Sequence, residues 1–364
     1  MMTRPPVEFP PTYFASRDRF RSVAKGLGWS CFAQPIADRG PGGEELTVDA
    51  AVSPANGAER VLVVSSGLHG VEGPFGAAVQ LAAMEHWAKR SGPPSGVRYV
   101  FLHALNPHAF ANGRRADANN VDPNRNFLLL GEEYKGSSDG YRTFEWLLNP
   151  KRPPARWDGF RLRAWLALLR HGLPPLKQAL VTGQYEYPKG VYFGGQSPSA
   201  THVALRSRLK EWVGSAATAV HLDVHSGLGR WGSYKLLLDE PATQIQHTRL
   251  DKWFGPETYE VDHPDGVAYK PRGSFGPWCV AQGMAPDYLY LVAEFGTYGV
   301  VRMLSGLRRE NQAHHWGVPG HPNTEWAKAK LRELFCPASP EWRVRALTQG
   351  LELVKCAASG LSHL

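Results

Sequence analysis

The stretch from Ala58 to Arg90 constrains the fold most, because a strand, a glycine-rich turn and a helix follow one another there. RVLVVSS, at 60–66, is a short run rich in β-branched residues, which is typical of a buried strand. GLHGVEG follows as a turn, and PFGAAVQLAAMEHWAKR has helical spacing with Pro74 near its start. A further strand is predicted at 97–104, in GVRYVFLHA. This alternation predicts an α/β fold, in which helices flank a sheet.

The same alternation returns in the second half of the chain. A helix at 204–213 precedes a strand in TAVHLDVHSG, and further strands are predicted in SYKLLLD and YLYLVAEFG. Between these parts, residues 128–191 form a stretch rich in Trp and Arg that proline pairs interrupt. We therefore predict one domain over 1–364, with an insertion or lid at about 128–191 that packs on the sheet.

Composition and charge argue against several classes of protein. The net charge of +8 comes from 41 Lys and Arg that are scattered along the chain, and no nucleic-acid-binding module accompanies them, so no nucleic-acid role is expected. The apolar runs are too short to span a membrane or to serve as a signal peptide, which predicts a soluble, cytoplasmic protein. The four cysteines form no CxxC pair, which argues against a disulfide framework or a cysteine zinc site. The oligomeric state has no signal in the sequence.

His69 and Glu72 lie in the turn that follows the first predicted strand. Ligand sites in open α/β sheets gather at the carboxyl ends of the strands, so this turn is a favourable place for a site. A His-x-x-Glu pair has a second explanation, because a glutamate at a helix start interacts favourably with the helix dipole. The pair alone therefore leaves a functional and a structural role open.

The segment HLDVHSGLG contains three polar side chains that alternate along a predicted strand and so face the same side. His225 lies at the end of the strand, where it can reach a metal ion, whereas His221 is expected to form hydrogen bonds in the core. Asp223 is placed to orient a metal ligand through a hydrogen bond. Two imidazoles and one carboxylate, with a fourth position open to water, are common ligands of a catalytic zinc ion.

Two further segments contain candidate residues. In NPHAFANGRRADANNVDPNRNF, the side chains of Arg114, Arg115, Asn124 and Arg125 offer planar donors suited to a carboxylate or an oxyanion. A solvated basic loop would explain the same residues. In YLYLVAEFGTYG, Glu294 interrupts an apolar strand, and a buried carboxylate there serves either a structural ion pair or a catalytic base.

Together these segments resemble the zinc metallo-carboxypeptidase superfamily, and more closely its DUF2817 branch, which is related to aspartoacylase and succinylglutamate desuccinylase. HGVEG is similar to the superfamily's first zinc motif, DVHSG to the motif of the third ligand, NPHAF with DPNRNF to the arginine segment, and AEFGTYG to the catalytic glutamate motif. YPKGVYFGG and LRRENQAHHWG resemble sequence segments that are typical of the branch. The resemblance extends over 61–317 and implies an α/β domain with a mixed, mainly parallel sheet between helices.

The resemblance also implies a role for the residues of the first, third and fourth motifs. His69, Glu72 and His225 would hold one Zn²⁺, which lowers the pKa of its bound water to about 7 and polarises the scissile carbonyl. Glu294 would take the proton from that water and pass it to the leaving amine.

The arginine segment would bind substrate. Arg115, favoured over its neighbour Arg114, would stabilise the oxyanion, and Asn124 with Arg125 would hold a substrate carboxylate. A tyrosine that helps to bind substrate in better-known carboxypeptidases has no secure match in this sequence. Tyr269 is a candidate for it, and a surface aromatic is the alternative.

The implied function is a carboxypeptidase-like hydrolase that cleaves an amide bond next to a free carboxylate of a small peptide. One alternative keeps the zinc but takes an N-acyl amino acid, as a deacylase of the aspartoacylase or desuccinylase type would. A binding protein without catalysis is a second alternative, against which the full ligand set and Glu294 argue. His314 and His315 are expected to be packing or supporting residues and not metal ligands.

Overall fold

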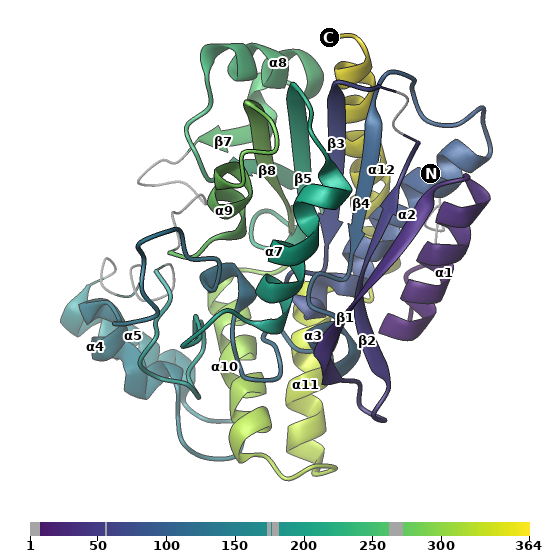
Figure 1. The fold of residues 1–364 in the computed structure, drawn as a ribbon. Coiled ribbons are helices and arrows are strands. Elements are labelled where there is room, and N and C mark those ends of the chain that lie inside the picture. The colour runs from purple at the N-terminus through teal and green to yellow at the C-terminus, as the bar shows by residue number, and fades with distance from the viewer. Residues whose placement is uncertain (1–7, 55–56, 173–175, 177–181, 262–271) are drawn as a thin grey trace.

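The computed structural model describes residues 8–54, 57–172, 176, 182–261 and 272–364, which form an α/β fold around an eight-stranded sheet (Figure 1). The strand order is β1-β2-β4-β3-β5-β8-β6-β7. The four central strands are parallel to one another: β4 (Arg98–His103), β3 (Arg60–Ser66), β5 (Thr218–Gly227) and β8 (Asp287–Gly296). The outer strands introduce antiparallel pairs: β1 (Ser30–Arg39), β2 (Glu45–Val52) and β6 (Tyr234–Leu238), with β7 (Tyr259–Val261) parallel to β6. The predicted mixed, mainly parallel sheet is confirmed.

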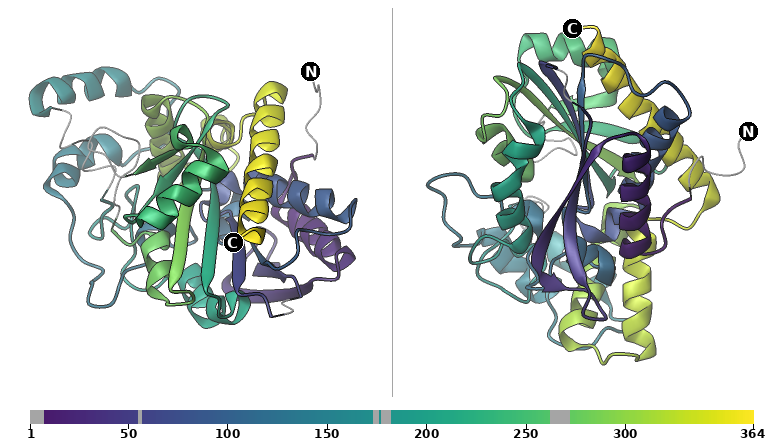
Figure 2. Two further views of the ribbon diagram at one scale, coloured as in Figure 1. Left: turned by 90° about the horizontal axis from the view of Figure 1, so that it is seen from above. Right: turned by 45° about the vertical axis from the view of Figure 1, so that its right-hand side comes forward.

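Helices cover both faces of the sheet (Figure 2). Strand β3 shows why, because Leu62 and Val64 pack into one apolar core while Val61 and Val63 pack into the other. The helices of the first core are α2 (Gly73–Ala88) and α12 (Pro340–Ser362), with α1 (Tyr13–Gly26) against α2 and α8 (Gln244–Phe254) against α12. The second core contains α7 (Ala200–Val213) and α9 (Phe275–Ala281).

Short elements and a helical hairpin gather at the carboxyl ends of the central strands. The hairpin consists of two adjacent helices, α10 (Val300–Trp316) and α11 (Pro322–Phe335). The short elements are η1 (Gly70–Glu72), α3 (Pro107–Asn112) and η2 (Pro123–Arg125), and a third 3₁₀ turn, η3 (Pro256–Thr258), lies by β6. Because β4 and β5 lie on opposite sides of β3, the strand order reverses here, which is where ligands bind in open α/β sheets.

The described part of 128–191 contains two helices that pack on α10. They are α4 (Asp139–Leu148) and α5 (Phe160–His171), and their apolar side chains form a small core with Leu304 of α10. Arg308 of α10 donates to the carbonyl of Leu147 and forms a buried ion pair with Asp158. These contacts fix the segment to the helical hairpin. Its role as a lid stays a prediction.

None of the described helices is long and apolar enough to cross a membrane. The four cysteines are free thiols. The sequence patterns did not predict the helix α1 or the strands β1 and β2, which occupy 13–52.

Candidate metal centre

The turn after β3 brings His69 and Glu72 to the edge of the sheet. The chain reverses at Gly67, whose φ of +69° favours glycine, and His69 then precedes η1 in an extended conformation. The turn lies directly against α3: a Cβ on Gly70 would lie 2.0 Å from the backbone nitrogen of Phe110. Only glycine fits there, so Gly70 of the HGVEG motif is required for the close approach of η1 and α3.

Among the described residues, one group of His, Cys, Asp and Glu side chains has metal-ligand geometry. Ligand atoms of His69, Glu72 and His225 all lie within 4.8 Å of one another, and the three residues are buried. The Nδ1 atoms of His69 and His225 lie 3.0 and 3.1 Å from the two carboxylate oxygens of Glu72. Burial would raise the pKa of Glu72, but the two imidazoles lower it to about 2, so this carboxylate is ionised.

The second ring nitrogen of each histidine faces another buried carboxylate. Nε2 of His69 lies 3.2 Å from Oδ1 of Asp122, and Nε2 of His225 lies 2.6 Å from Oδ2 of Asp223. Such pairs fix the orientation of metal-binding imidazoles and leave Nδ1 free to act as a ligand. Burial would raise the pKa of Asp122, but Arg115 and His69 lower it well below its usual range.

The structure thus places Asp223 where it can orient His225, and His221 where it can stabilise the core. Asp223 accepts hydrogen bonds from the hydroxyls of Ser65 and Tyr290, at 2.5 and 2.7 Å. The two ring nitrogens of His221 lie 2.7 Å from the Ser65 hydroxyl and 3.0 Å from the Tyr288 hydroxyl, so this ring faces away from the ligand group.

Glu294 lies beside the ligand group because β5 and β8 are neighbours. In the register of the two strands, Glu294 is paired with His225. Its Oε1 accepts a hydrogen bond from the backbone nitrogen of Leu228 at 2.7 Å. Burial and the nearby carboxylate of Glu72 raise the pKa of Glu294 to about 7. A carboxyl group with this pKa can take up and release a proton near neutral pH.

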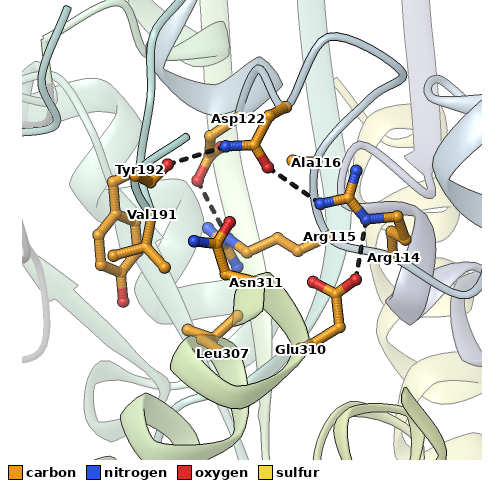
Figure 3. A pocket seen from close by; sticks show the side chains of 11 residues that line it. Arg114, Arg115, Ala116, Asp122, Val191, Tyr192, Leu307, Glu310 and Asn311 are labelled. Carbon is orange, nitrogen blue, oxygen red and sulfur yellow. Dashed lines mark hydrogen bonds and ion pairs between the residues drawn. The ribbon is translucent and has the colours of Figure 1, made fainter. Parts of the chain in front are cut away.

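The two adjacent arginines point to different places (Figure 3). Arg115 donates to Oδ2 of Asp122 at 3.0 Å, and its guanidinium lies 3.7 Å from Oε1 of Glu72. Arg114 is buried and bonds to Glu310 and Asn120, at 2.8 and 2.9 Å. Arg115 therefore belongs to the candidate centre, whereas Arg114 connects the loop to α10.

Arg125 is a buried cation without a carboxylate partner in the described part of the chain. Arg125 is 7% exposed. Among the described residues its side chain makes one hydrogen bond, from Nη1 to the carbonyl of Asn124 at 2.6 Å, and its Nε has no partner there. Burial lowers the pKa of Arg125, and the charge of Asp122 opposes this shift. An unpaired buried guanidinium is costly, which suits a site for an anion.

Asn124 uses its side-chain oxygen within the protein. That oxygen accepts hydrogen bonds from the backbone nitrogen of Phe275 and from the Ser274 hydroxyl, at 2.9 and 3.3 Å. Its amide NH₂ has no hydrogen bond to another described residue and remains able to donate. Beyond Ser274 lies a cavity of about 140 Å³, whose lining includes Phe127, Asp239 and Pro277.

The remaining candidates lie elsewhere. Tyr269 falls outside the described residues. His314 and His315 lie in the last turn of α10 with their ring centroids 4.6 Å apart, and neither belongs to the ligand group.

Two residues of the site were not singled out from the sequence. Asp122 is one, although its place in DPNRNF beside the arginines was a usable signal, and Tyr192, in YPKGVYFGG, is the other.

Tyr192 lines the cavity that also contains Arg115 and Asp122. Its φ is +58°, a left-handed conformation that costs a bulky L-residue about 1–2 kcal/mol. Its ring centroid lies 5.9 Å from Cζ of Arg115 and 5.8 Å from Cζ of Arg125.

Solved structures with similarity to this chain include three hydrolases. A metallo-carboxypeptidase from Burkholderia cenocepacia is 12% identical, with 96% of this chain and 69% of that chain covered and a TM-score of 0.49. Carboxypeptidase A from Helicoverpa armigera is 13% identical, with 88% and 73% covered and a TM-score of 0.45. The murein-tripeptide amidase MpaA from Escherichia coli O157 is 18% identical, with 77% and 92% covered and a TM-score of 0.37. These similarities are too distant to assign an activity or a substrate.

The sequence itself has a clear family match. No curated protein matches it. The family model described as "Protein of unknown function (DUF2817)" matches residues 9–349, which is most of the chain. The chain therefore belongs to the DUF2817 family, in agreement with the resemblance of its motifs.

Proposed function

We propose that this protein is a zinc-dependent, carboxypeptidase-like hydrolase that cleaves an amide bond next to a free carboxylate. The main support is the convergence of His69, Glu72 and His225 beside a carboxyl group, Glu294, with a pKa of about 7. The ligand set fits Zn²⁺, since two imidazoles and a carboxylate leave a coordination position for water. The carboxylates of Asp122 and Asp223 are also consistent with a zinc site, because they orient the two imidazole rings.

The residues of the centre have distinct tasks in this proposal. Zn²⁺, when bound, supplies the Lewis acidity that polarises the scissile carbonyl and makes water more acidic. Glu294 accepts the proton of the attacking water and returns it to the nitrogen of the leaving amine. Arg115 donates hydrogen bonds to the carbonyl oxygen as negative charge develops on it. Its contact with Asp122 holds the guanidinium near the ligand group before substrate arrives.

Asn124 and Arg125 form the proposed carboxylate-binding pair. The guanidinium of Arg125 is buried, and a substrate carboxylate would be its counter-ion. The preceding residue, Asn124, would add a hydrogen bond from its amide NH₂. A fixed carboxylate places the adjacent amide bond at the metal centre, which is how a terminal residue is selected. The cavity beyond Ser274 offers space for the side chain of the residue that is released.

A deacylase for N-acyl amino acids is the second candidate, because Arg125 would bind the carboxylate of such a substrate equally well. A binding protein without catalysis is less well supported. Binding alone does not need a buried carboxyl group with a pKa near 7 beside the three ligands.

The test is to present zinc-loaded protein with peptides that have a free C-terminus, with the same peptides amidated, and with N-acyl amino acids. We expect amidation to lower kcat/KM by about 10–100-fold, since it removes a charge-assisted hydrogen-bonded pair. On the free peptide, the kcat/KM of Arg125→Lys should fall by a similar factor, because an ammonium cannot form two parallel hydrogen bonds. On the amidated peptide, the variant and the wild type should differ little in kcat/KM. Arg142→Lys, at an exposed ion pair, is the control.

Preferential hydrolysis of N-acyl amino acids would select the second candidate. Turnover that responds neither to amidation nor to Arg125→Lys would refute the carboxylate-binding pair. An absence of turnover across the panel, with zinc bound, would count against a hydrolase.

A further inference from the structure

Tyr192 adopts an unfavourable backbone conformation next to the candidate centre. Besides glycines, three described residues have positive φ, namely Ala104, Asn120 and Tyr192. Tyr192 has the largest side chain of the three, and it lies between two buried residues, Val191 and Phe193. Its carbonyl accepts a hydrogen bond from the backbone nitrogen of Gln184 at 3.1 Å. A large residue is retained in such a conformation only where the surroundings enforce it, and the contacts of the Tyr192 side chain can supply that constraint.

The ring of Tyr192 is an aromatic neighbour that both arginines of the proposed substrate site share. Cζ of Arg115 and Cζ of Arg125 each lie within 6 Å of its centroid, the range of a cation–π interaction. Figure 3 shows the ring at the side of the cavity into which Arg115 extends. The negative face of an aromatic ring attracts cations, and it can therefore hold two guanidiniums near each other despite their repulsion.

The two arginines depend on this ring to different degrees. Arg115 also bonds to Asp122 and lies over the ring of Phe335. Arg125 has the carbonyl of Asn124 as its hydrogen-bond partner in the described part of the chain. The side chain of Arg125 has therefore fewer restraints, and the loss of the Tyr192 ring should affect it more.

The hydroxyl of Tyr192 has no hydrogen bond to another described residue. Burial raises its pKa, so the group is neutral near pH 7. The ring, and not the hydroxyl, makes the contacts that the structure shows.

We propose that Tyr192 is a positioning residue, whose ring sets the orientation of Arg125, and to a smaller extent of Arg115, for binding the substrate carboxylate. The activity part of its test rests on the proposed function, whereas the positions of the guanidiniums do not. The ring of Tyr187, in the same segment, packs at a tilt against that of Tyr141, and it makes no cation–π contact with either arginine in the described part of the chain, so Tyr187→Leu is a matched control.

The experiment compares Tyr192→Phe, Tyr192→Leu and Tyr187→Leu with the wild type. Each variant is checked for zinc content and melting temperature, its crystal structure is determined, and kcat and KM are measured on free and amidated peptides. We expect Tyr192→Leu to bind zinc normally, to displace the guanidinium of Arg125, and to lose about 10-fold in kcat/KM on the free peptide, mainly through KM. Its loss on the amidated peptide should be smaller. Tyr192→Phe should restore both the guanidinium position and the kinetics.

Three outcomes would overturn the proposal. One is a Tyr192→Leu variant with both guanidiniums unmoved, and another is an equal loss on free and amidated peptides, as a purely structural role predicts. The third is a Tyr192→Phe variant as impaired as Tyr192→Leu, which would assign the role to the hydroxyl. If the wild type hydrolyses no peptide, the proposed function fails, and the crystal structures still decide the role of Tyr192.

Discussion

Each imidazole of the proposed metal centre has a buried aspartate at the ring nitrogen that faces away from Glu72. Nε2 of His69 faces Asp122, and Nε2 of His225 faces Asp223. These contacts hold the rings in one orientation. The cost of arranging the ligands is then met largely during folding, which favours tight metal binding.

The variant Glu294→Gln should retain zinc and fold but lose catalysis. Glutamine has nearly the same shape and can still accept the hydrogen bond from the Leu228 backbone, but it cannot take the proton of the attacking water. We expect kcat/KM to fall by about 100-fold or more, with an unchanged zinc content by atomic absorption. Loss of zinc from this variant would instead make Glu294 a ligand or a structural partner.

Asp122→Asn should weaken zinc binding by about 10–100-fold. In other metalloproteins, loss of a carboxylate that accepts a hydrogen bond from a metal-binding imidazole has an effect of this size. The carboxylate of Asp122 lies 3.2 Å from Nε2 of His69, and an amide would orient the ring less well. Competition with a chromophoric chelator measures the affinity. Asp117→Asn is the control, because Asp117 accepts hydrogen bonds from backbone nitrogens of the same loop and lies outside the ligand group. Equal zinc affinity in both variants would refute the role of Asp122.

The sequence showed some of these residues and not others for physical reasons. A polar residue at the end of an apolar strand is conspicuous, so His225 and Glu294 could be singled out. The DPNRNF segment drew attention to the residues around Asp122, but the role of Asp122 depends on a contact with a residue 53 positions away, which the local sequence does not show. Tyr192 is conspicuous through its φ and its neighbours, and both require coordinates.

At the scale of elements, burial explains why β3 could be predicted and β1 could not. Strand β3 is buried along most of its length and therefore reads as a continuous apolar run. Strand β1, at the edge of the sheet, is mostly exposed and contains Gln34 and Pro35, so its sequence resembles a loop. Prolines marked 128–191 as a distinct stretch in the sequence, but its attachment through Arg308 depends on α10, which lies far along the chain.

Gly70→Ala should disrupt the contact of η1 with α3. The added Cβ would lie 2.0 Å from a backbone atom of Phe110, which cannot move without shifting α3. We expect a loss of about 1–3 kcal/mol in the free energy of unfolding, together with reduced zinc affinity, since His69 is the preceding residue. Urea denaturation and zinc titration measure the two effects. Gly26→Ala, where the Cβ meets no atom within 4 Å, is the control, and two variants with the same behaviour would contradict the close-contact argument.

For the whole molecule, buried neutral histidines should make stability fall in mild acid. Burial lowers the pKa of His103 from 6.5 to about 3, and the pKa values of His202 and His221 to about 4. Below pH 6.5 the unfolded chain binds a proton at each of these positions and the folded chain does not. Their contribution to stability is therefore complete above pH 6.5 and is lost as the pH falls toward the folded-state pKa.

His103→Gln isolates one of these contributions. The difference in unfolding free energy between pH 7 and pH 5, from urea denaturation, should be smaller in the variant than in the wild type by about 1–2 kcal/mol. Asp49, whose pKa burial raises to about 6, has the opposite dependence and is present in both proteins. His363→Gln, at an exposed position, serves as control. The same pH dependence in all three proteins would show that His103 titrates equally in the folded and unfolded chain.

The strand order has a consequence for the assembly of the centre. Strands β1 to β4 make up one half of the sheet and β5 to β8 the other, and the halves join where β3 pairs with β5. His69 and Glu72 belong to the N-terminal half, whereas His225 and Glu294 belong to the C-terminal half. The proposed ligand set is complete only when this seam is closed, so we expect zinc affinity to report on how well two sequence-contiguous halves of the chain have docked.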